Sequence, residues 1–139
     1  MNAIDVILRD HRAAEELFDK FRAASEEERE PMEKQVFDAL TAHEKMEDSH
    51  FYPALRGKLD DKLFTDLEGE QKTLEVEVLA ARALPGDKSE RILKMMDTVL
   101  AHAKKEEAEI LPEAKKLLTE EELDTLGAAM EPESAAANA

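Results

Sequence analysis

The chain has 139 residues, with 34 acidic and 19 basic side chains, a net charge of −15 at pH 7 and no cysteine. The lack of cysteine excludes disulfides, thiolate-bound metals and iron–sulfur clusters, and so acidic a surface is repelled by nucleic acids and anionic membranes, so neither is an expected partner. Glycine and proline number only 4 and 5, which favours one all-helical domain with a hydrophobic core.

The first predicted helix follows Asn2, a good N-cap residue, and ends near position 24. Its apolar side chains recur at intervals of three, four and seven residues, and the stripe that they form includes His11. Two starts of the second helix are open. A capping box predicts a start at Ser25 with Pro31 kinking the helix, whereas the usual place of proline predicts a start near Glu30.

The second and fourth predicted helices share one pattern, an inner face that is apolar, then polar for one turn, then apolar again. The polar turn of the second helix consists of His43 and Glu47. The fourth helix opens at Ser89, and its polar turn consists of His102 and Glu106. Both helices therefore place a histidine and a glutamate where a plain core would be apolar.

A third helix, capped by one of the aspartates at positions 60 and 61, is predicted between them, and Leu84-Pro85-Gly86-Asp87 ends it. A capping box at Thr119 opens a short fifth helix. Long amphipathic helices with short links predict an all-α, up-down-up-down four-helix bundle with a short C-terminal fifth helix. We expect residues 1–130 to form the bundle and residues 131–139 to be a mobile tail.

The same short pattern occurs in two distant stretches, His43 with Glu47 and His102 with Glu106. In each stretch a second acidic residue follows the glutamate, and a proline lies ten residues after the histidine. Residues four apart lie on one face of a helix, so each pair can aim an imidazole nitrogen and a carboxylate oxygen at one point. The repetition predicts that both pairs face one metal centre inside the bundle.

The candidate ligands of this centre interrupt apolar stripes with nitrogen or oxygen donors, and they are His11, His43, Glu47, His102 and Glu106. A histidine and a glutamate four apart are usually a solvated pair. Burying all five without a partner would, however, cost several kcal/mol, which a metal compensates. Such donors suit iron, manganese or zinc, and helical bundles hold two-metal carboxylate sites in this way. Asp48 and Glu107 are candidates for hydrogen bonds to the ligating imidazoles.

The chain also divides into two helical hairpins, because His11 precedes His43 by 32 residues and Gln71 precedes His102 by 31. By this internal symmetry Gln71 stands where a fourth histidine is expected. Three outcomes are open: Gln71 binds weakly or through water, Glu75 replaces it one turn further on, or one metal is lost. We favour a metal site with altered or lower occupancy at this corner.

Two further side chains near the motifs are interpreted as structural. His50 lies about a full turn beyond Glu47, and we expect it to be partly exposed at the rim of the bundle. Tyr52 is expected to pack its ring inside and to keep its hydroxyl in water, as tyrosine commonly does.

The chain resembles the hemerythrin-like (HHE cation-binding) proteins over about residues 2–118. Three segments carry the resemblance by their order and spacing: Asp10-His11, His43-x3-Glu47-Asp48-x2-Phe51-Tyr52-Pro53 and His102-x3-Glu106-Glu107. The resemblance implies a four-helix bundle with a non-haem iron centre, usually of two iron ions, and it matches the five candidate residues to family ligands. The family usually has histidine where this chain has Gln71. Such centres bind O2 reversibly or respond to nitric oxide, peroxide or iron.

Three functions are open after this resemblance. The first is a non-haem iron protein that binds or senses a small ligand (O2, NO or peroxide) or handles iron. The second is a di-iron oxidase or peroxide-consuming enzyme, and the third is a degenerate or zinc-holding structural bundle. We expect two iron ions, with one iron, manganese or zinc as alternatives, and we lean against catalysis. The N-terminus lacks the features of a secretory signal and no apolar run approaches a membrane span, so a cytoplasmic location is expected.

Overall fold

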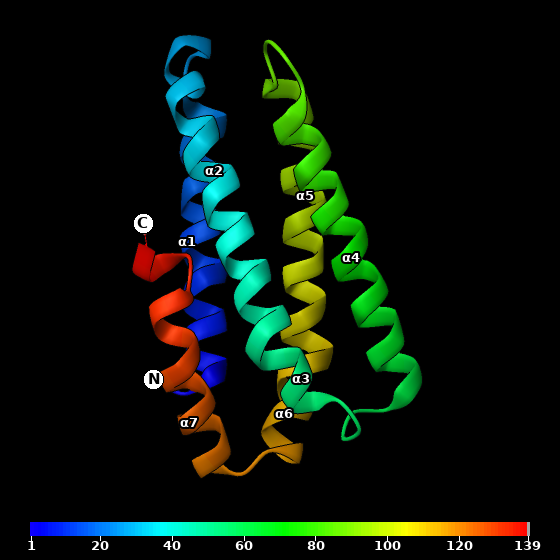
Figure 1. The fold of residues 1–139 in the computed structure, drawn as a ribbon. Helices are drawn as coiled ribbons and strands as arrows, with labels where there is room; N and C mark the ends of the chain where they lie inside the picture. The colour runs from blue at the N-terminus through cyan, green and yellow to red at the C-terminus, as the bar shows by residue number, and fades with distance from the viewer. Residues whose placement is uncertain (139) are drawn as a thin grey trace.

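The computed structural model describes residues 1–138, and this part of the chain is helical, without strands. Four long helices run up, down, up and down (Figure 1): α1 (Ala3–Ala23), α2 (Glu26–Met46), α4 (Asp61–Ala83) and α5 (Ser89–Lys105). The predicted fifth helix is α7 (Glu120–Met130), which lies along α1. The all-α bundle predicted from the sequence is confirmed. No helix among the described residues has both the length and the apolarity needed to cross a membrane.

Side-chain caps set where the first two helices begin. Asn2 and Asp5 form a capping box at the start of α1, and Ser25 and Glu28 form another at the start of α2. The earlier of the two starts considered for the second helix is therefore the one found, and Pro31 lies inside α2. The capping box outweighs the preference of proline for the first turn.

Each of the two motif-bearing helices continues as one π-helical turn. These turns are Glu47–Phe51 (η1) after α2 and Glu106–Ile110 (η2) after α5. A short helix follows each turn, α3 (Tyr52–Leu55) and α6 (Leu111–Leu117). Each short helix has its proline in the first turn, where no amide hydrogen is required. A π turn holds one residue more than an α turn. It therefore rotates the side chains that follow by about 100° around the helix axis, relative to an unbroken α-helix.

Apolar side chains fill the bundle in two clusters. One includes Val6, Phe51, Leu67 and Ile110, and the other includes Phe18, Phe37, Val78 and Ile92. Near the places where the chain passes from one cluster to the other, on the long helices and at the start of the π turns, lie the buried polar side chains Asp10, His11, Glu44, Glu47, Gln71 and Glu106. The bundle therefore has a polar layer between two apolar ones.

The chain continues beyond α7 as two short 3-10 turns, η3 (Glu131–Glu133) and η4 (Ala136–Asn138). They lie beside the middle of α1 (Figure 1). Two backbone amides of this segment hydrogen-bond the side chain of Asp10. The segment is thus packed against α1, while its predicted mobility stays a prediction. Ala139 lies outside the described residues.

We expect Gly127→Ala to destabilise the protein by about 1–3 kcal/mol, because α7 meets the start of α1 at this glycine. A Cβ there would lie 2.5 Å from the carbonyl carbon of Asn2 and 2.7 Å from the amide nitrogen of Ala3. Gly69→Ala is the matched control, since nothing outside its own helix lies within 4 Å of the added Cβ. The control should be stabilised by about 0.5–1 kcal/mol. Urea unfolding measures both, and equal effects would contradict this close packing.

Candidate metal centre

Four of the predicted ligands converge in the middle of the bundle. His11 comes from α1, His43 from α2, Glu47 from the first π turn and Glu106 from the second. One donor atom of each lies within 4.8 Å of the others. Two imidazoles and two carboxylates so close together form a group that can hold a metal ion.

His43 lies between two carboxylates. Its Nδ1 is 2.8 Å from Oδ2 of Asp10, and its Nε2 is 3.2 Å from Oε1 of Glu47. Burial raises the pKa of Asp10, but the hydrogen bond and charge of His43 and the amides of Ala136 and Ala135 outweigh it, so the net pKa shift is downward. An ionised Asp10 only accepts hydrogen bonds. Nδ1 of His43 is therefore the protonated nitrogen, and Nε2 faces the centre.

His11 repeats this arrangement with partners from the second π turn. Its Nδ1 is 2.8 Å from Oε2 of Glu107, and its Nε2 is 3.1 Å from Oε1 of Glu106. Asp10 and Glu107 thus take the place of the carboxylates that stand behind metal-binding histidines and fix their tautomer. Of the two predicted imidazole partners, Glu107 contacts a histidine, whereas Asp48 shares a hydrogen bond with Glu75.

The facing atoms of the centre cannot satisfy one another without a cation. With Nδ1 protonated, Nε2 of His11 and Nε2 of His43 are lone-pair acceptors, and each faces a carboxylate oxygen at 3.1 or 3.2 Å. Among the described residues, Oε2 of Glu47 and Oε1 of Glu106 have no hydrogen-bond partner. Two acceptors this close need either a proton on the ring or a metal ion between them.

Without metal, the charges of the centre favour a proton on the ring of His43. Burial opposes a charge on His43, but the carboxylates of Glu47 and Asp10 raise its pKa well above the usual value. Burial and the neighbouring Glu106 raise the pKa of Glu47. Burial opposes the charge of Glu106 too, but its contacts with His11 and Glu47 and the charges of His11 and His43 lower its pKa to about 2. A metal that binds here displaces protons, so its affinity falls as the pH is lowered.

His102, the fifth predicted ligand, lines the same cavity but lies outside the group of four. Its Nε2 is buried and has no hydrogen-bond partner among the described residues, and its Nδ1 is 3.6 Å from Oε2 of Glu70. Glu70 precedes Gln71 as Asp10 precedes His11, so this pair is the counterpart of Asp10 and His43. A buried imidazole nitrogen without a partner is costly, and metal coordination would compensate it.

Gln71 fills the place of the missing fourth histidine and is 2% exposed. Its amide nitrogen lies 3.4 Å from Oε1 of Glu47, so its side chain contacts the centre. Glu75 is also outside that group, and burial followed by its hydrogen bond to Asp48 raises its pKa to about 7. Asp48, the counterpart of Glu107, is therefore paired with Glu75 and not with position 71.

The hydroxyl of Tyr52 reaches the centre, contrary to the expectation that it stays in water. Tyr52 is 3% exposed, and its hydroxyl donates to Oε2 of Glu106 at 2.9 Å. An unbroken α-helix would place Phe51 one turn beyond Glu47, but the π turn inserts one residue and brings Tyr52 there. Leu111 has the matching place after the second π turn. The proline six residues after each glutamate is a sequence signal for this break in the helical period.

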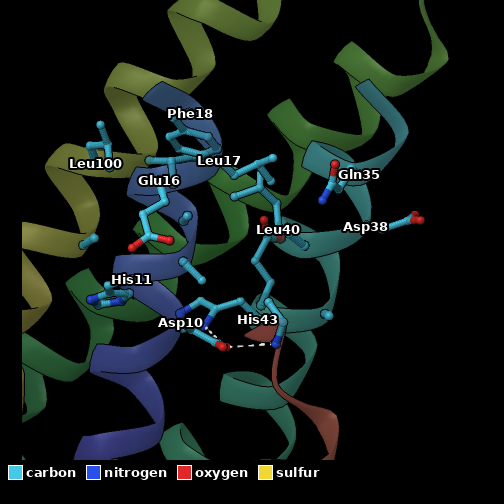
Figure 2. Close-up of a pocket in the computed structure, with 18 of the residues that line it drawn as sticks. Asp10, His11, Glu16, Leu17, Phe18, Gln35, Asp38, Leu40, His43 and Leu100 are labelled. Carbon is cyan, nitrogen blue, oxygen red and sulfur yellow. Dashed lines mark hydrogen bonds and ion pairs between the residues drawn. The ribbon is translucent and has the colours of Figure 1, made fainter. Parts of the chain in front are cut away.

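A cavity of about 380 Å³ opens from the centre and runs along α1 and α2 (Figure 2). Its lining includes His11, His43 and Gln71, and its walls are mostly apolar, with Phe18, Leu40, Leu74 and Val99 among them. The volume far exceeds the ~30 Å³ that one water molecule occupies in the liquid. A small ligand therefore has room to reach the centre.

Comparison with known proteins relates these residues to a described domain. Residues 2–114 match the family model of the hemerythrin HHE cation binding domain. A crystal structure of a hemerythrin HHE cation binding domain-containing protein from Mycobacterium kansasii is similar, with a TM-score of 0.78, 26% identity, and 94% of this chain and 83% of that chain covered. A curated protein of Nostoc sp. named DNA nickase is 26% identical over 128 residues, 89% of this chain. The chain spans only 36% of the length of that relative.

Proposed function

The chain belongs to the hemerythrin HHE cation-binding family, and from this we propose that it is a non-haem iron protein that binds or senses a small ligand or handles iron. The ligand is O2, NO or peroxide. The proposed metal ligands are the five residues His11, His43, Glu47, His102 and Glu106. We propose two iron ions, with one iron, manganese or zinc as the alternatives.

One observation carries this proposal. Two imidazole nitrogens face two buried carboxylate oxygens at 3.1 and 3.2 Å, and the opposite nitrogen of each ring is held by a further carboxylate. Glu47 and Glu106 come from opposite halves of the bundle, so their carboxylates can serve ions on both sides. Iron bound here would supply redox activity and open coordination positions, while the apolar cavity walls exclude bulk water.

The Gln71 corner is the proposed place for the small ligand. A glutamine amide is a weaker metal ligand than imidazole, so a metal ion held nearest this corner would have fewer strong ligands from the protein. The Tyr52 hydroxyl lies 3.4 Å from Oε1 of Gln71, and its single proton, which it donates to Glu106 in this structure, can instead be donated to an oxygen-containing ligand. Burial, with the charges of Glu47 and Glu106, raises the pKa of Tyr52 well above its usual value, so the phenol keeps its proton.

Metal analysis and absorption spectroscopy of protein expressed with added iron and purified in air test the proposal. We expect one or two iron ions per chain and near-ultraviolet charge-transfer absorption of ferric iron, which exposure to NO alters. A colourless, iron-free protein would contradict an iron function. Zinc at full occupancy would instead favour the structural alternative.

A peroxide-consuming activity is the second candidate, and the buried hydroxyl of Tyr52 favours it. A phenol beside the centre can deliver a proton to a bound peroxide, a contribution typically worth about 100-fold or more in rate. Tyr52→Phe should therefore keep the iron content, because no ligand is lost, and slow peroxide consumption by about 100-fold. Oxygen release or peroxide loss at 240 nm measures the rate at equal iron loading. If iron-loaded wild-type protein leaves peroxide intact, this candidate is wrong.

A further inference from the structure

The segment after α7, residues 131–138, lies beyond the matched family domain and contacts the proposed metal centre. We call it the C-terminal strap. The amide of Ala135 donates to Oδ2 of Asp10 at 3.1 Å, and the amide of Ala136 donates to Oδ1 at 2.8 Å. The same Oδ2 accepts the hydrogen bond from Nδ1 of His43. One carboxylate therefore joins the strap to a proposed ligand, as Figure 2 shows where the strap ribbon passes the Asp10–His43 pair.

Side chains anchor the strap on both sides of this contact. Arg9 donates to Oγ of Ser134 at 2.8 Å and pairs with Glu131 at 3.4 Å, and Ser134 is fully buried. On the other side, Glu133 shares a hydrogen bond with Nε2 of His50, whose side chain is 26% exposed, in line with the rim position expected for it. The strap is thus bound to α1 and to the first π turn at once.

The two amides determine how Asp10 presents its oxygens. A carboxylate with a single imidazole partner can rotate about its side-chain torsions, whereas one that also accepts from two fixed amides has its plane defined. The side chain of Asp10 is 1% exposed, so water does not compete for these bonds. The direction of Nδ1, and hence of Nε2 toward the metal, follows from the strap.

The counterpart on the other half of the bundle lacks this support. Glu70 stands behind His102 at 3.6 Å, its side chain is 40% exposed, and it also pairs with Lys105. His43 and His102 occupy equivalent places in the two motifs, yet only His43 has a buried carboxylate held by backbone amides among the described residues. The strap therefore distinguishes the two halves of the centre.

We propose that the C-terminal strap is a positioning element of the metal centre, which holds Asp10 so that His43 is pre-oriented for metal. The inference rests on the metal binding proposed above. It carries a reciprocal consequence, because two coupled binding events change each other's affinity by the same factor. Metal bound at His43 must tighten the docking of the strap.

Substitution of one strap residue tests the proposal in the full chain. Ala136→Pro removes the amide donor at the first position of η4, where proline is tolerated, and Ala136→Ser is the matched control that keeps the amide. We expect Ala136→Pro to weaken Co2+ binding by about tenfold and to change the visible Co2+ spectrum, as loss of an outer partner of a ligand histidine does. Asp10→Asn should have an equal or larger effect, and Ala136→Ser should bind as wild type does. Competition titration with a chelator measures the affinities.

Hydrogen exchange on the wild-type protein is the second measurement and needs no variant to fold. Saturating Co2+ should slow exchange of the Ala135 amide by about the same factor as Ala136→Pro weakens binding. Unchanged exchange, or equal Co2+ affinity of the proline and serine variants, would overturn the strap proposal while leaving metal binding intact. Failure of wild-type protein to bind Co2+ or Fe2+ would instead overturn the proposed function.

Discussion

Replacing Glu47 with glutamine should abolish tight iron binding and leave the metal-free protein at least as stable as wild type. Glutamine has the shape of glutamate and its oxygen still accepts from His43, but it brings no charge to bind a cation. The loss of affinity should exceed the about 10–100-fold that the loss of an outer partner costs. Stability does not fall, because burial beside Glu106 disfavours the charge of Glu47 in the absence of metal.

Chemical unfolding with and without Fe2+ under nitrogen separates the two effects. Wild-type protein should gain about 2.7 kcal/mol when free metal is roughly 100 times its Kd, and Glu47→Gln should gain almost nothing. Glu109→Gln, on the exposed side of the second π turn, is the control and should behave as wild type does. Equal metal-dependent stabilisation of all three proteins would show that Glu47 is not a ligand.

Replacing Gln71 with histidine should raise iron occupancy and tighten binding by about tenfold or more, because imidazole is the stronger donor. Gln71 is buried against Glu47, and the new ring has a partner waiting behind it. By the internal symmetry, Asp48 can accept its Nδ1 proton as Glu107 accepts that of His11. Iron analysis and titration at equal protein concentration measure the change.

A second substitution tells a new ligand from a mere packing effect. Asp48→Asn should have little effect in the wild-type background, where Asp48 pairs with Glu75. In the Gln71→His background, Asp48→Asn should remove most of the gain in iron affinity. The difference between the effects of Asp48→Asn in the two backgrounds is the coupling energy of the new pair. An unchanged iron-to-protein ratio in Gln71→His would mean that another residue, Glu75 foremost, already serves this corner.

The sequence allowed a prediction of which side chains lie on the same face of a helix. In the pairs His43–Glu47 and His102–Glu106 the glutamate is the first residue of a π turn, so the chain up to it still has a period of 3.6 residues, which places each pair on the inner face. The internal repeat likewise placed Gln71 opposite His11, and the structure buries Gln71 at the centre. The assignment of these side chains as metal ligands stays a prediction, because their burial and distances fit a metal without identifying it.

Three features of the site were not predicted from the sequence, because they depend on contacts between helices or on a break in the helical period. The pairing of Asp10 with His43 crosses from α1 to α2, and no pattern within either helix indicates it. The prediction that the hydroxyl of Tyr52 lies in water was wrong, because it assumed a helical period of 3.6 residues and the π turn has i→i+5 hydrogen bonds. The C-terminal strap is rich in alanine and has few large apolar side chains, and its contact with Asp10 is made by backbone amides, which carry no sequence signal.

The two π turns also bear on how such a centre can evolve. Deleting one of residues 48–50 would let the first turn relax to an α-helix and would make Tyr52 the fourth residue after Glu47, so the tyrosine hydroxyl would still face the centre. In a chain of unchanged length, an unbroken α-helix would instead present the phenyl ring of Phe51. The π turn therefore absorbs one extra residue without changing the side chain beside the centre, and relatives with one residue fewer in this interval should lack the π turn and keep the tyrosine.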